Sequence, residues 1–394
     1  MRRKAANHHE DAAAGGARRP AAHGAPQGPD GGGAGADTAV AAAVTACLRE
    51  FFAERSADVR AADTAEFADE VVRRLADFTL TGGKRLRPAF AWWGWRAAGG
   101  AAGGPRARAA LRAAAALELL HACALVQDDV MDGSALRRGR PALHAALARE
   151  HAERGWAGRA GRYGESVAVL AGDLALAWAE DLFTEAAAGL GAGRRARAPW
   201  RHVRTELIAG QFLDLRAQAS GDTAPATALR VDRLKTAAYS VERPLHLGAA
   251  LAGADDGLVR ALRGYGTAIG TAFQLRDDLL GVYGDPAATG KPVGDDIREG
   301  KPTLLWSAGL RRARERGGAA ERTLRTASGD PALTPSGVRG LGALLEDLGA
   351  RAEVESRIAR LLRTGLAHIA DTPMPGPARA ALRALAAQAA ARTA

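Results

Sequence analysis

From Thr38 onward, the sequence has the residue usage and spacing of one α-helix after another. Alanine, leucine, arginine and glutamate dominate and favour helices, whereas runs of β-branched and aromatic residues, which favour strands, are nearly absent. Val40, Val44 and Leu48 recur at helical spacing and mark a first amphipathic helix. We therefore expect an all-α fold.

Glycine-rich turns separate the predicted helices. Pro105 fits the first turn of a long helix that runs to about Gln127, because a proline there lacks only an N–H that has no helical partner. No linker or short repeat interrupts residues 38–394, so we expect one all-α domain. Surface loops or frayed ends are expected at 150–164, 190–200 and 311–335.

The first 37 residues differ from the rest. They are rich in Gly, Ala and Pro and carry almost no large apolar side chain, so they cannot bury enough surface to offset the entropy of ordering. We expect residues 1–37 to form a disordered tail. The basic start is not followed by an apolar stretch, which argues against a secretion signal.

Composition limits the partners and the compartment. The net charge of +10 favours an anionic partner, which could be nucleic acid, an acidic membrane or a phosphorylated small molecule. The two cysteines are too few for a disulfide framework, and this favours a reducing cytoplasm. No uninterrupted apolar run is long enough to cross a bilayer, so we expect no integral membrane association.

Two aspartate-rich segments each follow an apolar helix: Asp128-Asp129-Val130-Met131-Asp132, and Asp277-Asp278 far along the chain. Asp128 and Asp132 lie one helical turn apart, so their like charges repel and cost stability unless a cation bridges them. Mg²⁺ prefers carboxylate oxygens and shares them with substrate phosphates. A fold that joins the two segments would suit a magnesium–phosphate complex.

Basic clusters lie near both acidic segments. Gly82-Gly83 precedes Lys84, Arg85 and Arg87, and the first aspartates are followed by Arg137-Arg138-Gly139-Arg140. Further along are Lys235, Lys291 and Lys301. Arginine forks hold phosphate oxygens in pairs, and lysine adds a point charge. One such patch alone is usually a solvated surface, but the interleaving of both signs indicates a site for diphosphates.

Taken in order, these motifs closely resemble the trans-isoprenyl diphosphate synthases over about residues 40–370. The matching set comprises Gly82-Gly83-Lys84-Arg85-x-Arg87-Pro88, Asp128-Asp129-x-x-Asp132, Arg137-Arg138-Gly139, Gly172-Asp173, Gly210-Gln211-x-x-Asp214, Lys235-Thr236, Phe273-Gln274-x-x-Asp277-Asp278 and Gly290-Lys291-Pro292. The resemblance implies a single large helical bundle around a deep central cavity, usually in a homodimer. It also implies Mg²⁺ as cofactor.

The resemblance further implies a head-to-tail condensation of isopentenyl diphosphate with dimethylallyl, geranyl or farnesyl diphosphate. The allylic C–O bond ionises, the isopentenyl double bond attacks the cation, and a proton leaves. Asp128, Asp132 and Asp277 would hold the metal, and Lys235 would act with them in catalysis. Substrate contacts would come from Lys84, Arg87, His121, Arg137, Arg138, Thr236, Gln274, Lys291 and Lys301.

Two positions depart from the pattern: Gln127 stands where many members have histidine, and Gly281 where many have a third aspartate in the second motif. One turn before Asp128 the side chains are small, as at Ala124, and one turn deeper is the bulky Leu120. This order favours geranylgeranyl diphosphate as product.

Alternatives stay open at this point. The product could instead be farnesyl or a longer polyprenyl diphosphate. A class I terpene cyclase also uses an aspartate-rich motif with Mg²⁺, but it would not need the Gly82–Pro88 cluster. A non-catalytic subunit of a heteromeric synthase should have lost its aspartates. Nucleic-acid binding would explain the charge, but the sequence lacks any recognisable module, so we expect no nucleic acid.

Overall fold

A computed structural model describes residues 33–62, 64–285 and 293–390, and these residues form an all-α fold, as predicted. Their one pair of strands is a two-residue antiparallel pair, β1 (Leu136–Arg137) and β2 (Arg140–Pro141), in which Arg137 lies opposite Arg140. The helices are α1 (Gly33–Ala61), α2 (Ala65–Phe67), η1 (Ala68–Val72), α3 (Arg73–Leu80), α4 (Leu86–Ala97), α5 (Gly104–Met131), α6 (Leu143–Glu153), α7 (Ala160–Gly189), α8 (Gly193–Ser220), α9 (Pro225–Val231), η2 (Asp232–Glu242), α10 (Arg243–Ala252), α11 (Asp256–Tyr283), α13 (Asp295–Arg298), α14 (Leu304–Arg316), α15 (Ala319–Ala327), α16 (Pro335–Asp347), α17 (Ala350–Ala370) and α18 (Gly376–Ala390).

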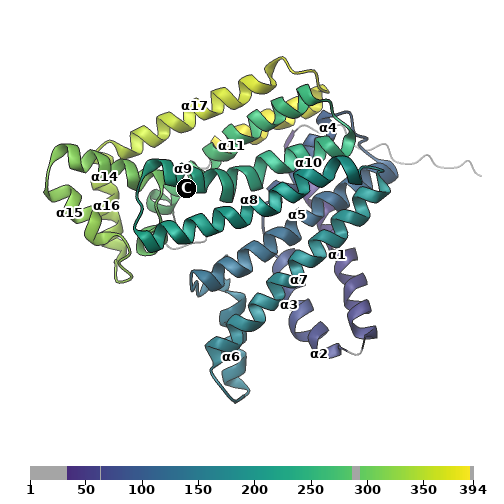
Figure 1. The fold of residues 1–394 in the computed structure, drawn as a ribbon, viewed down its shortest axis with the longest axis horizontal. Coiled ribbons are helices and arrows are strands. Elements are labelled where there is room, and N and C mark those ends of the chain that lie inside the picture. Colours follow the sequence, from purple (N-terminus) through teal and green to yellow (C-terminus); the bar gives the residue numbers. More distant parts are fainter. Residues whose placement is uncertain (1–32, 63, 286–292, 391–394) are drawn as a thin grey trace, which may run out of the picture.

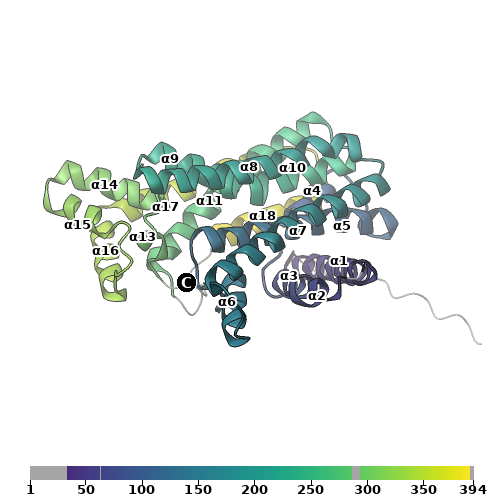
Figure 2. The ribbon, with the colours of Figure 1, turned by 60° about the horizontal axis from the view of Figure 1, so that its bottom comes forward.

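Long helices run beside one another through most of the molecule (Figure 1). Helix α5 packs along α7, α4 packs against α10, and α11 lies between the π-helix η2 and α17. Both views place α14, α15 and α16 together at one end of the bundle, while α6 projects from it elsewhere (Figures 1 and 2). This arrangement brings the C-terminal end of α5 towards α8, η2 and the loop before α14.

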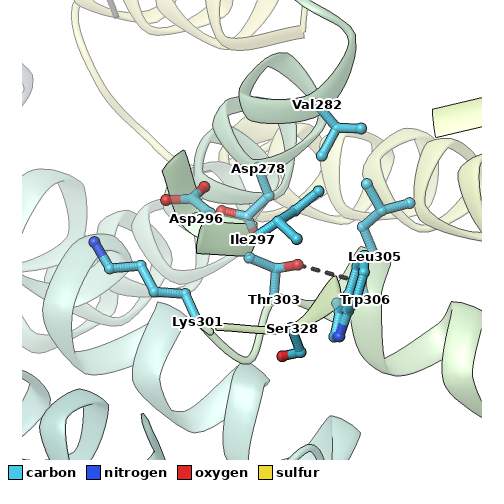
Figure 3. A pocket seen from close by; sticks show the side chains of 9 residues that line it. All are labelled: Asp278, Val282, Asp296, Ile297, Lys301, Thr303, Leu305, Trp306 and Ser328. Atoms are coloured by element: carbon cyan, nitrogen blue, oxygen red, sulfur yellow. Dashed lines mark hydrogen bonds between the residues drawn. The ribbon is translucent and has the colours of Figure 1, made fainter. Parts of the chain in front are cut away.

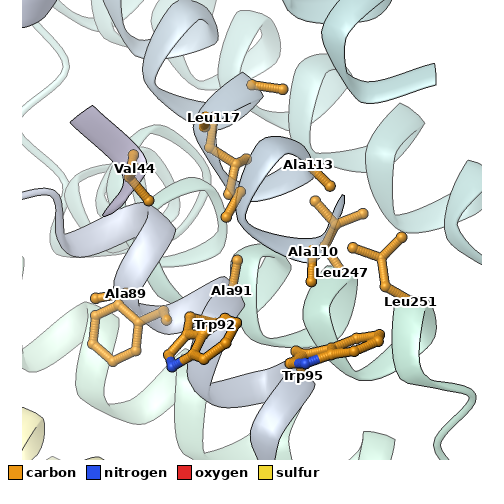
Figure 4. Packing of buried hydrophobic residues seen from close by; sticks show 14 of the residues in the cluster. Val44, Ala89, Ala91, Trp92, Trp95, Ala110, Ala113, Leu117, Leu247 and Leu251 are labelled. Carbon is orange, nitrogen blue, oxygen red and sulfur yellow. The ribbon is translucent and has the colours of Figure 1, made fainter. Parts of the chain in front are cut away.

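The largest hydrophobic cluster packs α1, α4, α5 and α10 together, and Figure 4 shows part of it. Trp92, Trp93 and Trp95 are all buried in this cluster, so these side chains serve core packing. A second cluster joins α11 to α14, α16 and α17. Helix α11 contributes to both, through Ile269 in the first and Leu275 in the second.

Pro105 does lie in the first turn of a long helix, α5. Some expected loops were wrong: α8 begins at Gly193, and α15 occupies Ala319–Ala327. Alanine and arginine are strong helix formers, and they outweigh the glycines beside them. Helix α1 begins at Gly33, ahead of the Thr38 start read from the sequence, and residues 1–32 of the expected tail lie outside the described residues.

One described helix, α5, is long and apolar enough to cross a membrane by length and composition alone, which the sequence reading had missed. Of its most apolar stretch, 67% is buried inside the fold. Core helices of globular proteins pass the same test, and α5 packs on six other helices: α1, α3, α4, α6, α7 and α10.

Candidate active site

The first aspartate motif closes α5, and two lysines from distant parts of the chain bind it. Lys235 Nζ donates to Asp128 Oδ1 over 3.2 Å, and Lys301 Nζ donates to Asp132 Oδ2 over 3.0 Å. Gln211 also donates to Asp128 Oδ1, at 3.0 Å. The expected repulsion between the two carboxylates is therefore relieved by the protein's own cations.

Helices α8 and η2 approach closely enough to place Lys235. A Cβ atom on Gly210 would lie 2.5 Å from the backbone nitrogen of Lys235, so only glycine allows this contact. One turn further along α8, Asp214 accepts a hydrogen bond from Lys235 Nζ at 2.6 Å. The Gly-Gln-x-x-Asp motif thus brings two helices together and supplies partners to both Asp128 and Lys235.

Electrostatics keep Asp128 ionised. Burial alone would raise the pKa of Asp128, but the nearby charges of Lys235, Lys301 and Arg137 outweigh burial and lower that pKa below its usual value. Arg137 is itself fixed by the buried Asp129, since its Nε donates to Asp129 Oδ1 over 2.8 Å. From there its terminal nitrogen lies 3.4 Å from Asp128 Oδ2.

The two basic motifs also meet. Gly82 and Gly83 both adopt positive φ angles and form a turn. The Arg138 side chain lies against this turn, and its Nη1 donates a hydrogen bond to the carbonyl oxygen of Thr81 over 2.8 Å. The Arg87 guanidinium carbon lies 4.3 Å from the ring centre of Tyr239 on η2, and the His121 ring lies 6.1 Å from the same ring. Helices α4, α5 and η2 thus bring these polar side chains together in one cluster.

Three polar atoms in this cluster of side chains are buried without a hydrogen-bond partner: Arg87 Nε, His121 Nδ1 and the Tyr239 hydroxyl. Such atoms are costly unless a ligand or water satisfies them. Burial and the charge of Arg87 hold the pKa of His121 well below its usual value, so the ring is neutral at pH 7. Sequence reasoning missed Tyr239, although it follows Lys235 by one turn of the same helix.

The second aspartate motif divides between two environments on α11. Asp277 is exposed, whereas Asp278 is buried and accepts a hydrogen bond from Gln274 over 2.7 Å. Asp278 and Lys301 help to line a small pocket, open in part to solvent (Figure 3). Burial would lower the pKa of Lys301, but Asp296, Asp132 and Glu299 raise it far above its usual value.

The donor set suits a hard divalent cation. Buried carboxylate oxygens of Asp129, Asp232 and Asp278 have no hydrogen-bond partner. Within the described ranges, no three side chains of His, Cys, Asp or Glu converge in a geometry that could hold a metal on their own. Mg²⁺ does not require that, because it keeps several waters and commonly binds one or two carboxylates plus substrate phosphates.

The structure therefore groups most of the predicted site residues. One group surrounds Asp128 and contains Asp132, Arg137, Lys235 and Lys301. A second group contains Arg87, His121 and Arg138.

The remaining predicted residues lie outside these two groups. Lys84 is exposed beside the glycine turn, and Thr236 is half-buried next to Lys235. Lys291 lies outside the described residues. Arg85 is buried and paired with the buried Glu118, which makes it part of the fold. Gln127, the departure from the usual histidine, donates to Asp173 over 3.1 Å.

Comparison with known proteins shows the fold and the family of this chain. The all-helical fold and the paired aspartate and basic motifs define a trans-prenyltransferase of the isoprenoid synthase type. A sequence profile described as polyprenyl synthetase matches residues 69–332, and the chain belongs to this family.

Three relatives illustrate the match. A crystal structure of geranylgeranyl pyrophosphate synthase from Corynebacterium glutamicum, complexed with isoprenyl diphosphate and magnesium, is 43% identical with a TM-score of 0.85; the match covers 90% of this chain and 98% of that one. A Sulfolobus acidocaldarius geranylgeranyl diphosphate synthase is 38% identical. The match covers 57% of this chain and only 62% of the length of that relative. A Mycobacterium tuberculosis (2E,6E)-farnesyl diphosphate synthase is 33% identical over 77% of this chain and 78% of its own length.

Proposed function

We propose that the protein condenses isopentenyl diphosphate with dimethylallyl, geranyl or farnesyl diphosphate and releases geranylgeranyl diphosphate and diphosphate. The observation that supports this proposal is the presence of two separate groups of polar side chains, each suited to a diphosphate. One is the aspartate–lysine group at the end of α5, and the other contains Arg87, His121 and Arg138. A one-substrate terpene cyclase has no use for the second.

Asp128, Asp132 and Asp277 would hold Mg²⁺, which as a Lewis acid stabilises charge on the departing diphosphate. Lys235 and Lys301 now donate to the carboxylates, and they would turn to the phosphate oxygens when the carboxylates have other ligands. Arg137, and Lys291 from outside the described residues, would add fixed positive charge there. No side chain has to act as a nucleophile.

The second site would bind isopentenyl diphosphate. Lys84, Arg87 and Arg138 would hold its phosphates, and the neutral His121 ring would donate one further hydrogen bond. The Gln274 amide, now bonded to Asp278, and the Thr236 hydroxyl would lie near the allylic cation.

We also propose a homodimer in the cytoplasm, with residues 38–394 as one domain. Support for one domain comes from α11, which contributes to both hydrophobic clusters. Deleting residues 2–37 should leave the melting temperature and the turnover nearly unchanged, since that segment carries almost no large apolar side chain. A large loss of either would show that the segment docks on the domain.

The test is an assay of the purified protein with isopentenyl diphosphate and each allylic diphosphate in turn, with Mg²⁺ or with EDTA. Mass spectrometry should find a twenty-carbon diphosphate that forms only with Mg²⁺ and both substrates. A hydrocarbon formed from one allylic diphosphate alone would contradict the proposal. A fifteen-carbon product would favour the farnesyl alternative, which the Mycobacterium relative also represents.

A further inference from the structure

The second aspartate motif of this chain has Gly281 where a third acidic side chain could stand, and the space above Gly281 is filled by another carboxylate. A Cβ atom on Gly281 would lie 2.9 Å from Asp296 Oδ2. Real Cβ atoms essentially never show a contact that short, so a side chain at position 281 would force the Asp296 carboxylate to move away from its present place.

The backbone holds Asp296 in this place. Gly294 N donates to the carbonyl oxygen of Gly281 over 2.8 Å, which ties the start of α13 to the end of α11. Two residues later, the backbone carbonyl of Asp296 accepts from Lys301 N at 2.8 Å. Main-chain hydrogen bonds therefore fix the backbone of this segment, and from it the Asp296 side chain extends over Gly281.

A second observation concerns the buried carboxylates around this place. Asp278 and Asp296 both line the pocket of Figure 3, where their side chains lie next to each other. Asp278 is only 4% exposed and its Oδ2 has no hydrogen-bond partner. Asp232, on η2, is 7% exposed and also has an unpartnered Oδ2. Each carboxylate acts on the others as a like charge.

The charges in this pocket do not balance. Asp278 and Asp296 share the pocket with one lysine, Lys301, which also pairs with Asp132, while the charge of Arg357 acts on Asp232. Burial and their like charges raise the pKa of Asp232 and of Asp278, and a hard divalent cation would allow these carboxylates to stay ionised.

We propose that Asp296 supplies the carboxylate that the second aspartate motif lacks at Gly281, and that it faces a divalent cation together with Asp278. The inference rests on the proposed function, because it assigns residues to a metal of that same reaction. Gly281 is then not the loss of a metal-binding residue, because a glycine at this position leaves room for the Asp296 carboxylate. Restoring an aspartate at position 281 is then harmful while Asp296 is present.

The experiment measures Mn²⁺ binding to the purified protein by electron paramagnetic resonance, with inorganic diphosphate present and no prenyl substrate. Asp296→Asn should weaken binding of Mn²⁺ at this site by about 10- to 100-fold, the usual loss when a group that supports a metal is removed. The matched control is Asp295→Asn, whose carboxylate pairs with Arg298 at 2.7 Å, and it should bind Mn²⁺ like the wild type.

A carboxylate exchange makes the test sharper. Gly281→Asp alone should weaken Mn²⁺ binding and lower the melting temperature, whereas Gly281→Asp combined with Asp296→Gly should recover most of the binding. The inference is overturned if Asp296→Asn binds Mn²⁺ like wild type, or if the folded exchange variant binds no better than Asp296→Asn. Should the exchange variant not fold, the comparison of Asp296→Asn with Asp295→Asn decides. Because no turnover is needed, a failure of the product assay remains a separate result.

Discussion

Replacing Asp128 with asparagine should destabilise the metal-free protein, although the change removes one of two like charges at the end of α5. Asp128 accepts from Lys235 and Gln211 and lies near Arg137. Hydrogen bonds to charged groups contribute about 1.5–3 kcal/mol each. In the variant, Lys235 still donates to Asp214, and the asparagine oxygen can still accept from Gln211. We therefore expect the free energy of unfolding to fall by about 1–2 kcal/mol.

For a domain of this size, that loss lowers the melting temperature by about 1–3 °C. Scanning calorimetry in EDTA at pH 7.5 measures it, with Asp347→Asn as control because Asp347 forms only an exposed pair with Arg316. Turnover with Mg²⁺ should fall about a hundred- to thousandfold, as when other preorganised electrostatic groups are removed. A melting temperature that rises in EDTA would show that carboxylate repulsion dominates, and it would refute this reasoning.

The difference in stability between the wild type and Asp128→Asn should depend on pH. The folded pKa of Asp128 is lowered, because Lys235, Lys301 and Arg137 outweigh the opposing effect of burial. Its contribution to stability is therefore complete above the unfolded pKa of about 3.9 and is lost as the pH falls through the folded pKa. The difference in melting temperature between wild type and Asp128→Asn should be constant from pH 6 to 8 and shrink below about pH 4.

Other substitutions test other parts of the account. Glu118→Gln leaves a buried arginine unpaired and should cost about 3–5 kcal/mol in chemical denaturation, and an unchanged midpoint would contradict the buried pair. Arg87→Ala should raise the KM for isopentenyl diphosphate more than for the allylic substrate, and Arg137→Ala should do the reverse; equal effects in steady-state kinetics would refute two separate sites. Ala124→Phe should shorten the product and Leu120→Ala should lengthen it by mass spectrometry, and an unchanged product would place the cavity floor on another helix.

Local signals in the sequence predicted much of this molecule. The helical spacing from Val40 onward and the proline at position 105 fix helices through interactions within a few residues, and the structure has both helices. The aspartate motifs could be placed at the ends of helices from the sequence, because the spacing of nearby residues predicts where a helix ends. The segment 319–327 was misread because its alanines and arginines form a helix despite neighbouring glycines.

Long-range pairing could not be predicted in the same way. The bond of Lys301 to Asp132, and that of Lys235 to Asp214, depend on how distant helices pack. The expected cost of two like charges on α5 was therefore overestimated. The carboxylate of Asp296 over Gly281 is likewise invisible in sequence, because it follows from a backbone bond between α11 and the start of α13.

A crystal structure with Mg²⁺ and a non-hydrolysable allylic diphosphate analogue would test the central claim most directly. We expect metal ions between the analogue's phosphates and the carboxylates of Asp128 and Asp132. Lys235 and Lys301 should have left those carboxylates for the phosphate oxygens. A structure in which the analogue binds elsewhere, or in which both lysines keep their present bonds of 3.2 and 3.0 Å to the aspartates, would contradict the account.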